Sequence, residues 1–220
     1  MKKEIKRDFW AAACTLAAFI LWTAAVKIID VRPIGPQGTS VGFALLNDFV
    51  HGLTGIHMAL YIITDWLGLV PLCAVIGFAA LGLTQWIKRK SIFKVDYSIL
   101  VLGVFYIVVM AVYMLFEMVV INYRPVLING YLEASYPSST TMLVLCVMPT
   151  AIMQLNIRIK NNIFRRCIAI SISVFIVFMV IVRLLSGVHW FTDIMGGILL
   201  SVGLVIMYRA FSSLGIKQQE

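Results

Sequence analysis

The chain has 220 residues, of which 61% are hydrophobic and only 13% are charged. A water-soluble domain carries roughly a quarter charged residues, because its surface must be polar. This composition therefore excludes an ordinary soluble protein. The net charge of +8 invites a nucleic-acid partner, but the positions of the basic residues argue against one.

The sequence contains six long apolar stretches, and a helix needs about 20 apolar residues to cross a bilayer. We therefore predict an all-α, polytopic membrane protein with six transmembrane helices, forming a single domain over residues 1–220. A short amphipathic helix over Val41–His51 is expected to lie on the membrane surface. The second stretch is long enough to be tilted or to extend beyond the bilayer. The predicted spans are Phe9–Ile29, Met58–Ile87, Tyr97–Ile121, Met142–Leu155 with its flanks, Cys167–Leu185 and Phe191–Ala210.

The basic residues predict the orientation of these spans. Of the 18 Lys and Arg residues, 14 fall in the two termini and in the loops after the second and fourth spans. The positive-inside rule makes that side cytoplasmic, with both termini inside and the segments 30–57, 122–141 and 186–190 outside. The charge is thus explained by topology, and no nucleic-acid partner is predicted. The 14 residues are Lys2, Lys3, Lys6, Arg7, Lys88, Arg89, Lys90, Lys94, Arg158, Lys160, Arg165, Arg166, Arg209 and Lys217.

Three ionisable residues surround the last outer turn: Arg183, His189 and Asp193. Charged groups at the ends of apolar spans are costly, and by default they indicate function. His189 and Asp193 are four residues apart, so on one helix they share a face. The carboxylate can then hold one imidazole nitrogen and leave the other as a nucleophile or base. Arg183 is suited to clamping phosphate oxygens.

The second outer segment supplies Arg124-Pro125 and then the run Ser138–Thr141 before the fourth span. Ser and Thr at a helix start cap it, and the free N–H groups there form an anion site. Each feature alone has a plainer explanation, as a helix cap, an interfacial arginine or an interfacial histidine. Because all of them fall on one side of the membrane, we predict one shared anion site.

At these residues the sequence resembles the membrane-bound phosphatidic acid phosphatases, the superfamily of lipid phosphate phosphatases and vanadium haloperoxidases. The family signature is Lys-x6-Arg-Pro, then Pro-Ser-Gly-His, then Ser-Arg-x5-His-x3-Asp. Here Arg124-Pro125 matches the end of the first part, and Pro137-Ser138 opens the second. The third part is matched in full spacing by Arg183, His189 and Asp193, with Val182 in place of Ser.

The resemblance implies a hydrolase that acts on lipid phosphates or diphosphates at the outer leaflet of the cell membrane. It implies that His189 attacks phosphorus to form a phosphohistidine and that Asp193 orients it. No metal or cofactor is implied. The implied phosphate-binding groups are Arg124, Arg183, Ser138, Ser139 and Thr140.

Two positions depart from the family pattern. Glu117 stands where the family has the lysine of the first part, and Thr140 stands where it has the histidine that protonates the leaving group. A threonine hydroxyl cannot act as a general acid near neutral pH.

Three explanations follow from this departure. The chain is a catalytically impaired relative that binds lipid phosphate or acts as a partner protein; or it cleaves diphosphates, whose leaving group needs no proton; or another group supplies the proton. The main candidate for that group is Glu117, if burial raises its pKa, with His51 and His57 as weaker ones. A transporter is disfavoured because the charges gather at one membrane face, and only Asp65 speaks for it.

Overall fold

The structure of the chain is a computed structural model that describes residues 3–216. Lys2, Lys217 and the two ends of the predicted domain lie outside the described residues. Between residues 3 and 216 the regular elements are helices, with a few isolated β-bridges and no β-strand, which confirms the all-α prediction. The α-helices are α1 (Lys3–Ile28), α2 (Ala44–Thr54), α3 (Met58–Leu67), α4 (Leu69–Arg89), α5 (Tyr97–Met118), α6 (Ser139–Arg158), α7 (Asn162–Leu185) and α8 (Phe191–Ile216).

Six helical segments in the described part of the chain are long and apolar enough to cross a membrane, with α3 and α4 counted as one segment. The number of spans is the predicted one. Large apolar side chains cover the outside of the bundle; Trp10 is 72% exposed and Phe93 is 92% exposed. Such a surface is stable only where the surrounding solvent is lipid.

The predicted second span is divided in the structure. α3 ends at Leu67, Gly68 follows, and α4 begins at Leu69. Pro71 explains the break, because proline has no N–H and its ring clashes with the carbonyl four residues back, here that of Leu67. The over-long stretch is therefore two helices, of which α3 is the one nearer to α2.

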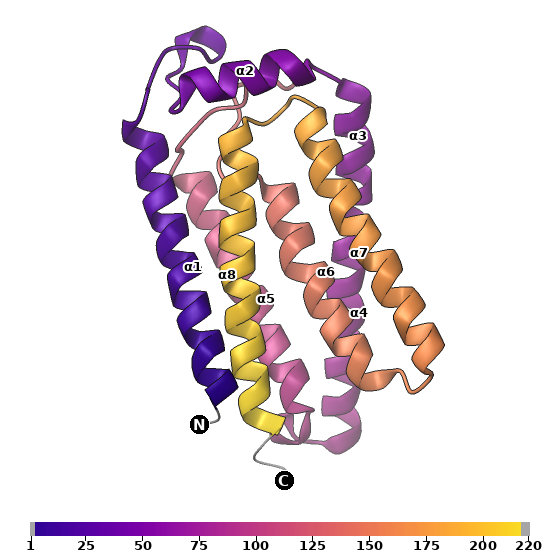
Figure 1. The fold of residues 1–220 in the computed structure, drawn as a ribbon. Coiled ribbons are helices and arrows are strands. Elements are labelled where there is room, and N and C mark those ends of the chain that lie inside the picture. The colour runs from indigo at the N-terminus through magenta and orange to yellow at the C-terminus, as the bar shows by residue number, and fades with distance from the viewer. Residues whose placement is uncertain (1–2, 217–220) are drawn as a thin grey trace.

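Other predicted boundaries also differ from the structure. The third span ends at Met118, three residues before the predicted end at Ile121. The surface helix α2 begins at Ala44, because Phe43 has a φ of 48° and so cannot continue a right-handed helix. α2 lies across one end of the bundle (Figure 1).

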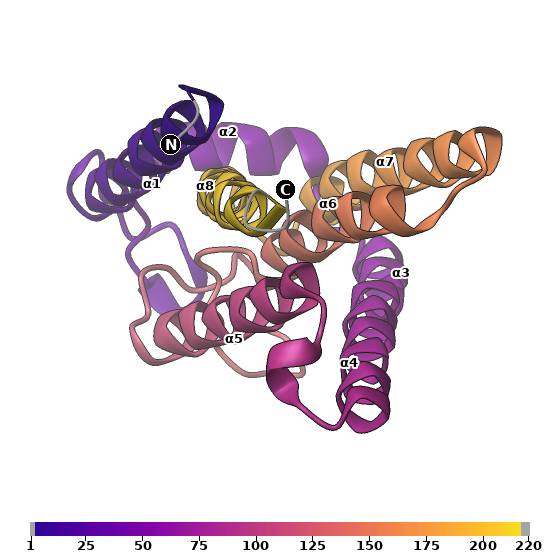
Figure 2. The same ribbon diagram turned by 90° about the horizontal axis from the view of Figure 1, so that it is seen from below.

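α8 is the central helix of the bundle (Figure 2). It packs against α1, α5 and α6, while α3 and α4 stand at the periphery against α7 and α6. The main hydrophobic core lies between α1, α5, α6 and α8. Its buried members include Phe19, Leu102, Phe105, Tyr136, Met142, Leu204 and Tyr208.

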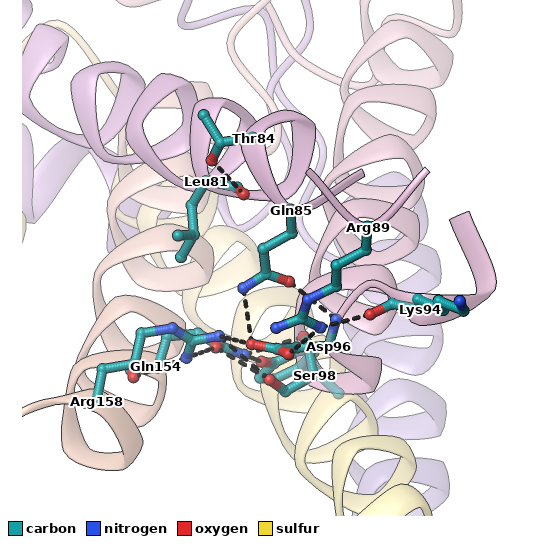
Figure 3. Close-up of polar contacts among 10 residues, drawn as sticks. Leu81, Thr84, Gln85, Arg89, Lys94, Asp96, Ser98, Gln154 and Arg158 are labelled. Carbon is teal, nitrogen blue, oxygen red and sulfur yellow. Dashed lines mark hydrogen bonds and ion pairs between the residues drawn. The ribbon is translucent and has the colours of Figure 1, made fainter. Parts of the chain in front are cut away.

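The bundle has two chemically different ends. The start of α1, the end of α8 and the α4–α5 and α6–α7 connections lie together at one end, called the basic end here; α2 and the α7–α8 turn lie at the other, the α2 end (Figure 1). At the basic end, Asp96 accepts hydrogen bonds from Gln85 and Arg89 of α4 at 2.7 and 2.9 Å. It also lies 3.7 Å from the guanidinium of Arg158 on α6. This cluster joins three helices (Figure 3).

Candidate active site

The α7–α8 turn positions the predicted nucleophile. α7 ends at Leu185 and α8 begins at Phe191, so His189 lies in the turn and Asp193 in the first turn of α8. The expectation that both residues sit on one helix was therefore wrong. Their four-residue spacing still brings His189 Nδ1 within 3.8 Å of Asp193 Oδ2.

The turn itself is fixed by close backbone contacts. Gly187 has a φ of 68°, and a Cβ atom built there would lie 1.8 Å from the carbonyl oxygen of Gly55. Ser186 accepts a hydrogen bond from the backbone N–H of His57 at 2.9 Å. The turn is thus held against the segment that joins α2 to α3.

The α5–α6 loop contributes the next layer of the site by folding back on itself. Arg124 N donates to the carbonyl of Glu133, and Ser135 N donates to the carbonyl of Asn122, at 3.1 and 2.9 Å. This pairing places the side chains of Arg124 and Ser135 beside His189.

Ser135 lies between the predicted catalytic pair. Its Oγ is 3.0 Å from His189 Nδ1, and its hydroxyl donates to Asp193 Oδ2. A hydroxyl has one proton to give, so Ser135 accepts the hydrogen bond from the N–H at His189 Nδ1. That assignment leaves His189 Nε2 unprotonated, and its lone pair accepts a hydrogen bond from Arg124 NH1 at 3.4 Å.

Asp193 is fully buried, and every hydrogen bond it accepts comes from a fixed donor. Besides Ser135, these donors are the backbone N–H of Trp190 at 2.9 Å and Nδ2 of Asn122 at 3.2 Å. A buried carboxylate is stable only with such partners. Asp193 therefore acts on His189 chiefly through Ser135.

Two buried arginines, Arg124 and Arg183, lie near His189. Arg124 NH1 lies 3.4 Å from His189 Nε2, and Arg183 NH1 donates to Thr64 Oγ1 at 3.0 Å. The Tyr61 ring lies between them, 5.8 Å from the Arg124 guanidinium and 4.8 Å from that of Arg183. Tyr61 thus links the two guanidinium groups through cation–π contacts.

The arginines keep donors free for an anion. The Nε atoms of Arg124 and Arg183 are buried and make no hydrogen bond within residues 3–216. Arg124 Nε does lie 3.0 Å from the carboxylate of Glu133, as an ion pair at an angle unsuited to a hydrogen bond. Buried, unpaired guanidinium N–H groups are costly without a ligand.

The same charges act on His189. Burial, and then the positive charges of Arg124 and Arg183, lower the pKa of His189 well below its usual value of 6.5. Both causes disfavour the protonated ring. The imidazole is therefore neutral near pH 7, as a nucleophile must be.

The start of α6 supplies further polar groups to the site. Ser138 precedes the helix; its N–H donates to the carbonyl of Asp193 at 3.1 Å, and its hydroxyl accepts from Thr141 at 3.0 Å. Both groups of Ser138 are thus engaged within the protein, which leaves the amides of Ser139 and Thr140 as donors. The first amides of a helix have no intrahelical partner and favour anions.

Glu117, the predicted substitute acid, lies in the last turn of α5 and is exposed. It lines a small cavity with Ser135, Tyr136 and Ser139.

An apolar groove leads away from the site, between α3–α4, α5 and the first half of α6. Its volume is about 340 Å³. Asp65, Tyr113, Ser139 and Thr140 line one part of it, which we call the groove mouth. A second cavity of about 430 Å³ shares Val75 and Tyr106 with it and continues toward the basic end. The apolar lining of the groove includes Leu69, Leu72, Val109, Met110, Leu143 and Val147.

The structure brings the predicted residues Arg124, Arg183, His189 and Asp193 together. Sequence reasoning missed Ser135, Asn122, Tyr61 and Thr64, which hold them in place. One signal was available for α3: Tyr61, Thr64 and Asp65 recur at helical spacing within an apolar span, which marks a polar face. Within residues 3–216 no group of three His, Cys, Asp or Glu side chains is arranged to hold a metal ion.

Fold and site together define a multi-pass membrane protein with six spans and a buried His–Arg site at one end. The sequence model of the PAP2 superfamily matches residues 120–215, the part that carries Arg124, Arg183, His189 and Asp193. This match, over less than half of the chain, agrees with the family resemblance that the signature indicated.

One solved structure supports the fold. The crystal structure of a transmembrane PAP2-type phosphatidylglycerolphosphate phosphatase from Bacillus subtilis aligns with a TM-score of 0.57 over 92% of this chain and 96% of that one. The two sequences are 20% identical, so this likeness concerns the fold alone. A search of curated proteins found no match.

Proposed function

We propose that this protein hydrolyses lipid phosphates or diphosphates through a phosphohistidine formed on His189. The observation that carries the proposal is the unprotonated Nε2 of His189, which accepts a hydrogen bond from Arg124 NH1 at 3.4 Å with Arg183 nearby. A neutral imidazole beside two guanidinium groups suits attack on a phosphoryl group.

In the proposed reaction, His189 Nε2 attacks phosphorus, and the bond to the leaving oxygen breaks. Arg124, Arg183 and the first amides of α6 hold the equatorial oxygens. The positive charge that develops on the ring is stabilised by Asp193 through the Ser135 hydroxyl. Water then cleaves the N–P bond and releases phosphate.

The apolar groove supports a lipid as substrate. It opens beside the α6 amides, and its lining residues Leu69 and Met110 are 47% and 50% exposed on the lipid-facing surface. A hydrocarbon chain in the groove would leave its phosphate at the arginines. The Bacillus subtilis protein named above is a phosphatase for such a headgroup, which agrees with this substrate class.

The site is proposed to face the outer leaflet. Lys88 and Arg89 end α4, Arg158 ends α6 and Arg166 lies near the start of α7, so all four flank the connections at the basic end. Basic residues beside such connections stay in the cytoplasm. The α2 end, with His189, would then be outside and both termini inside.

The leaving group decides which substrates react. Thr140 has no proton to give near neutral pH, so a lipid alkoxide leaves only if another acid assists, whereas a diphosphate can expel a phosphate monoester unaided. Glu117, the acid suggested by the sequence, lines the small cavity with Ser135 and Ser139.

The test is phosphate release from matched lipid monophosphates and diphosphates in detergent. His189→Ala should abolish turnover of both. Thr140→His should raise the monophosphate rate, up to the general-acid factor of about 10²–10⁴. Binding of phosphate lipid without turnover, in the original protein and in Thr140→His, would instead identify a non-enzymatic binder.

A further inference from the structure

The proposed hydrolysis lacks an assigned proton donor, and the inference below rests on that proposed function. Cleavage of a lipid monophosphate leaves an oxygen that must receive a proton, and positioned proton transfer is typically worth about 10²–10⁴ in rate. Thr140 occupies the family position for this role and cannot fill it.

The site restricts where the leaving oxygen lies. The phosphoryl group belongs among His189, Arg124 and Arg183, and the hydrocarbon chain belongs in the groove. The oxygen that joins them must therefore cross the groove mouth. Of the residues that line the mouth, Asp65 is the one with a carboxyl group, and Thr140 lines the same mouth from α6.

Asp65 is tied to the phosphate site through its own helix. The preceding residue, Thr64, accepts a hydrogen bond from Arg183 NH1 at 3.0 Å. Tyr61, one turn earlier on α3, carries the ring that lies 4.8 Å from the Arg183 guanidinium. These two contacts fix the segment of α3 that presents Asp65, so its carboxyl group has a defined place beside the clamp.

The other carboxyl groups near the site are engaged or lie elsewhere. Asp193 is saturated by Ser135, Trp190 and Asn122. Glu133 pairs with Arg124 at 3.0 Å.

Glu117 lines the small cavity that shares Tyr113 and Ser139 with the groove, but it does not line the groove itself. The backbone carbonyl of Asp65 accepts from Gly68 N at 3.1 Å, but its carboxyl group makes no hydrogen bond or ion pair with any other residue between 3 and 216, and its charge acts on Arg183. An uncommitted carboxyl group at the leaving-group position is the arrangement that a general acid requires.

We propose that Asp65 protonates the leaving oxygen in place of the missing histidine. His189 Nε2 forms a bond to phosphorus as the P–O bond to the lipid breaks. The electron pair of that bond stays on the lipid oxygen, which takes the proton from the Asp65 carboxyl group and departs as an alcohol. In the second step, Asp65 takes a proton from the attacking water, whose oxygen bonds to phosphorus as the N–P bond breaks. Phosphate and free His189 result, and Asp65 is protonated again.

The experiment compares substrates whose leaving groups differ in their need for a proton. An alkyl phosphate and a nitroaryl phosphate with hydrocarbon chains of equal length are assayed with Asp65→Asn in the full-length protein. The alkyl phosphate rate should fall about 10²–10⁴-fold, while the nitroaryl phosphate and a lipid diphosphate should lose less than about tenfold. Asp65→Glu, which keeps the acid, should preserve most of the alkyl phosphate rate.

Two further variants complete the test. Glu117→Gln should leave the ratio of alkyl to aryl rates unchanged, and Thr140→His in the Asp65→Asn background should restore alkyl phosphate cleavage. Equal losses of Asp65→Asn on all three substrates, or a selective loss in Glu117→Gln, would overturn the assignment. If the proposed function itself is wrong, the result is different, because His189→Ala would then retain the activity on every substrate.

Discussion

Ser135 is the residue that most changes the view of this site. A His–Asp pair at 3.8 Å is too long for a direct hydrogen bond, and the serine hydroxyl joins the two groups instead. The orientation of His189 therefore depends on a residue from the α5–α6 loop, 54 positions away in the chain.

Replacing Ser135 by alanine removes both of these hydrogen bonds and leaves Asp193 with two donors. Because the ring is then less well oriented, we expect kcat to fall by about tenfold, the equivalent of one net hydrogen bond of about 1–1.5 kcal/mol. KM should change little, since Ser135 does not hold phosphate. Ser139→Ala, a neighbouring hydroxyl deletion that spares the amide, is the matched control and should keep kcat. A tenfold rise in KM at unchanged kcat would place Ser135 in substrate binding instead.

The pH dependence should report the arginines around His189. In the proposed mechanism the ring attacks only when neutral, and its lowered pKa keeps it neutral as the pH falls below 6.5. The acid limb of kcat/KM should therefore lie below pH 6.5. Arg183→Gln removes one positive charge, so the pKa of His189 should rise and the acid limb should move to higher pH. The same variant should also bind phosphate about 10- to 100-fold more weakly.

The limb is measured on one substrate, so that the ionisation of its phosphate is common to both proteins. Arg32→Gln is the control, because Arg32 pairs with Asp30 on the α1–α2 connection at 2.7 Å. An acid limb that stays in place in Arg183→Gln would show that burial alone lowers the pKa of His189.

The sequence predicted which charged residues come together, because their spacing across a short turn leaves few alternatives. Arg183, His189 and Asp193 lie within eleven positions of one another. The supports of the site could not be predicted in the same way. Thr64 meets Arg183 across 119 positions, and such a contact depends on how α3 packs against α7.

At the scale of elements, the α7–α8 turn is the part that tolerates least change. Gly187→Ala introduces a side chain at a φ of 68° and within 1.8 Å of the Gly55 carbonyl. The left-handed backbone alone costs about 1–2 kcal/mol, and the clash must also push the α2–α3 segment away. We expect a lower Tm in detergent together with a large loss of activity, since the turn carries His189.

Gly77→Ala is the matched control, because a Cβ there meets nothing within 4 Å and alanine favours the helix interior of α4. That variant should keep its Tm and its activity. A Gly187→Ala protein with unchanged Tm would mean that the turn and the α2–α3 segment separate easily.

The helices themselves were largely predictable, and their ends were less so. Hydropathy identified six spans because each must bury about 20 residues in lipid. The break at Gly68 was missed although Pro71 signals it. This break matters for function, since it separates α3, which holds the arginines, from α4, which lines most of the groove.

At the scale of the whole molecule, the distribution of charge predicts the orientation in the membrane. In a cysteine-free background, single cysteines at the exposed positions Ser40 and Tyr131 should react with an impermeant thiol reagent added to intact cells. A cysteine at Lys160, on the α6–α7 connection, should react only after the cells are opened. The reverse pattern would place the site in the cytoplasm.

The groove between α4 and α5 also determines how substrate is supplied. Its walls include Leu69 and Met110, which face the lipid, so a substrate need not leave the bilayer to reach His189. Encounters would then occur by diffusion within a two-dimensional film, and the relevant concentration is the mole fraction of substrate among the surrounding lipids or detergent. Adding inert detergent at constant total substrate should slow the reaction by surface dilution, although nothing has inhibited the protein. For this chain, the membrane is the solvent of the substrate as well as of the fold.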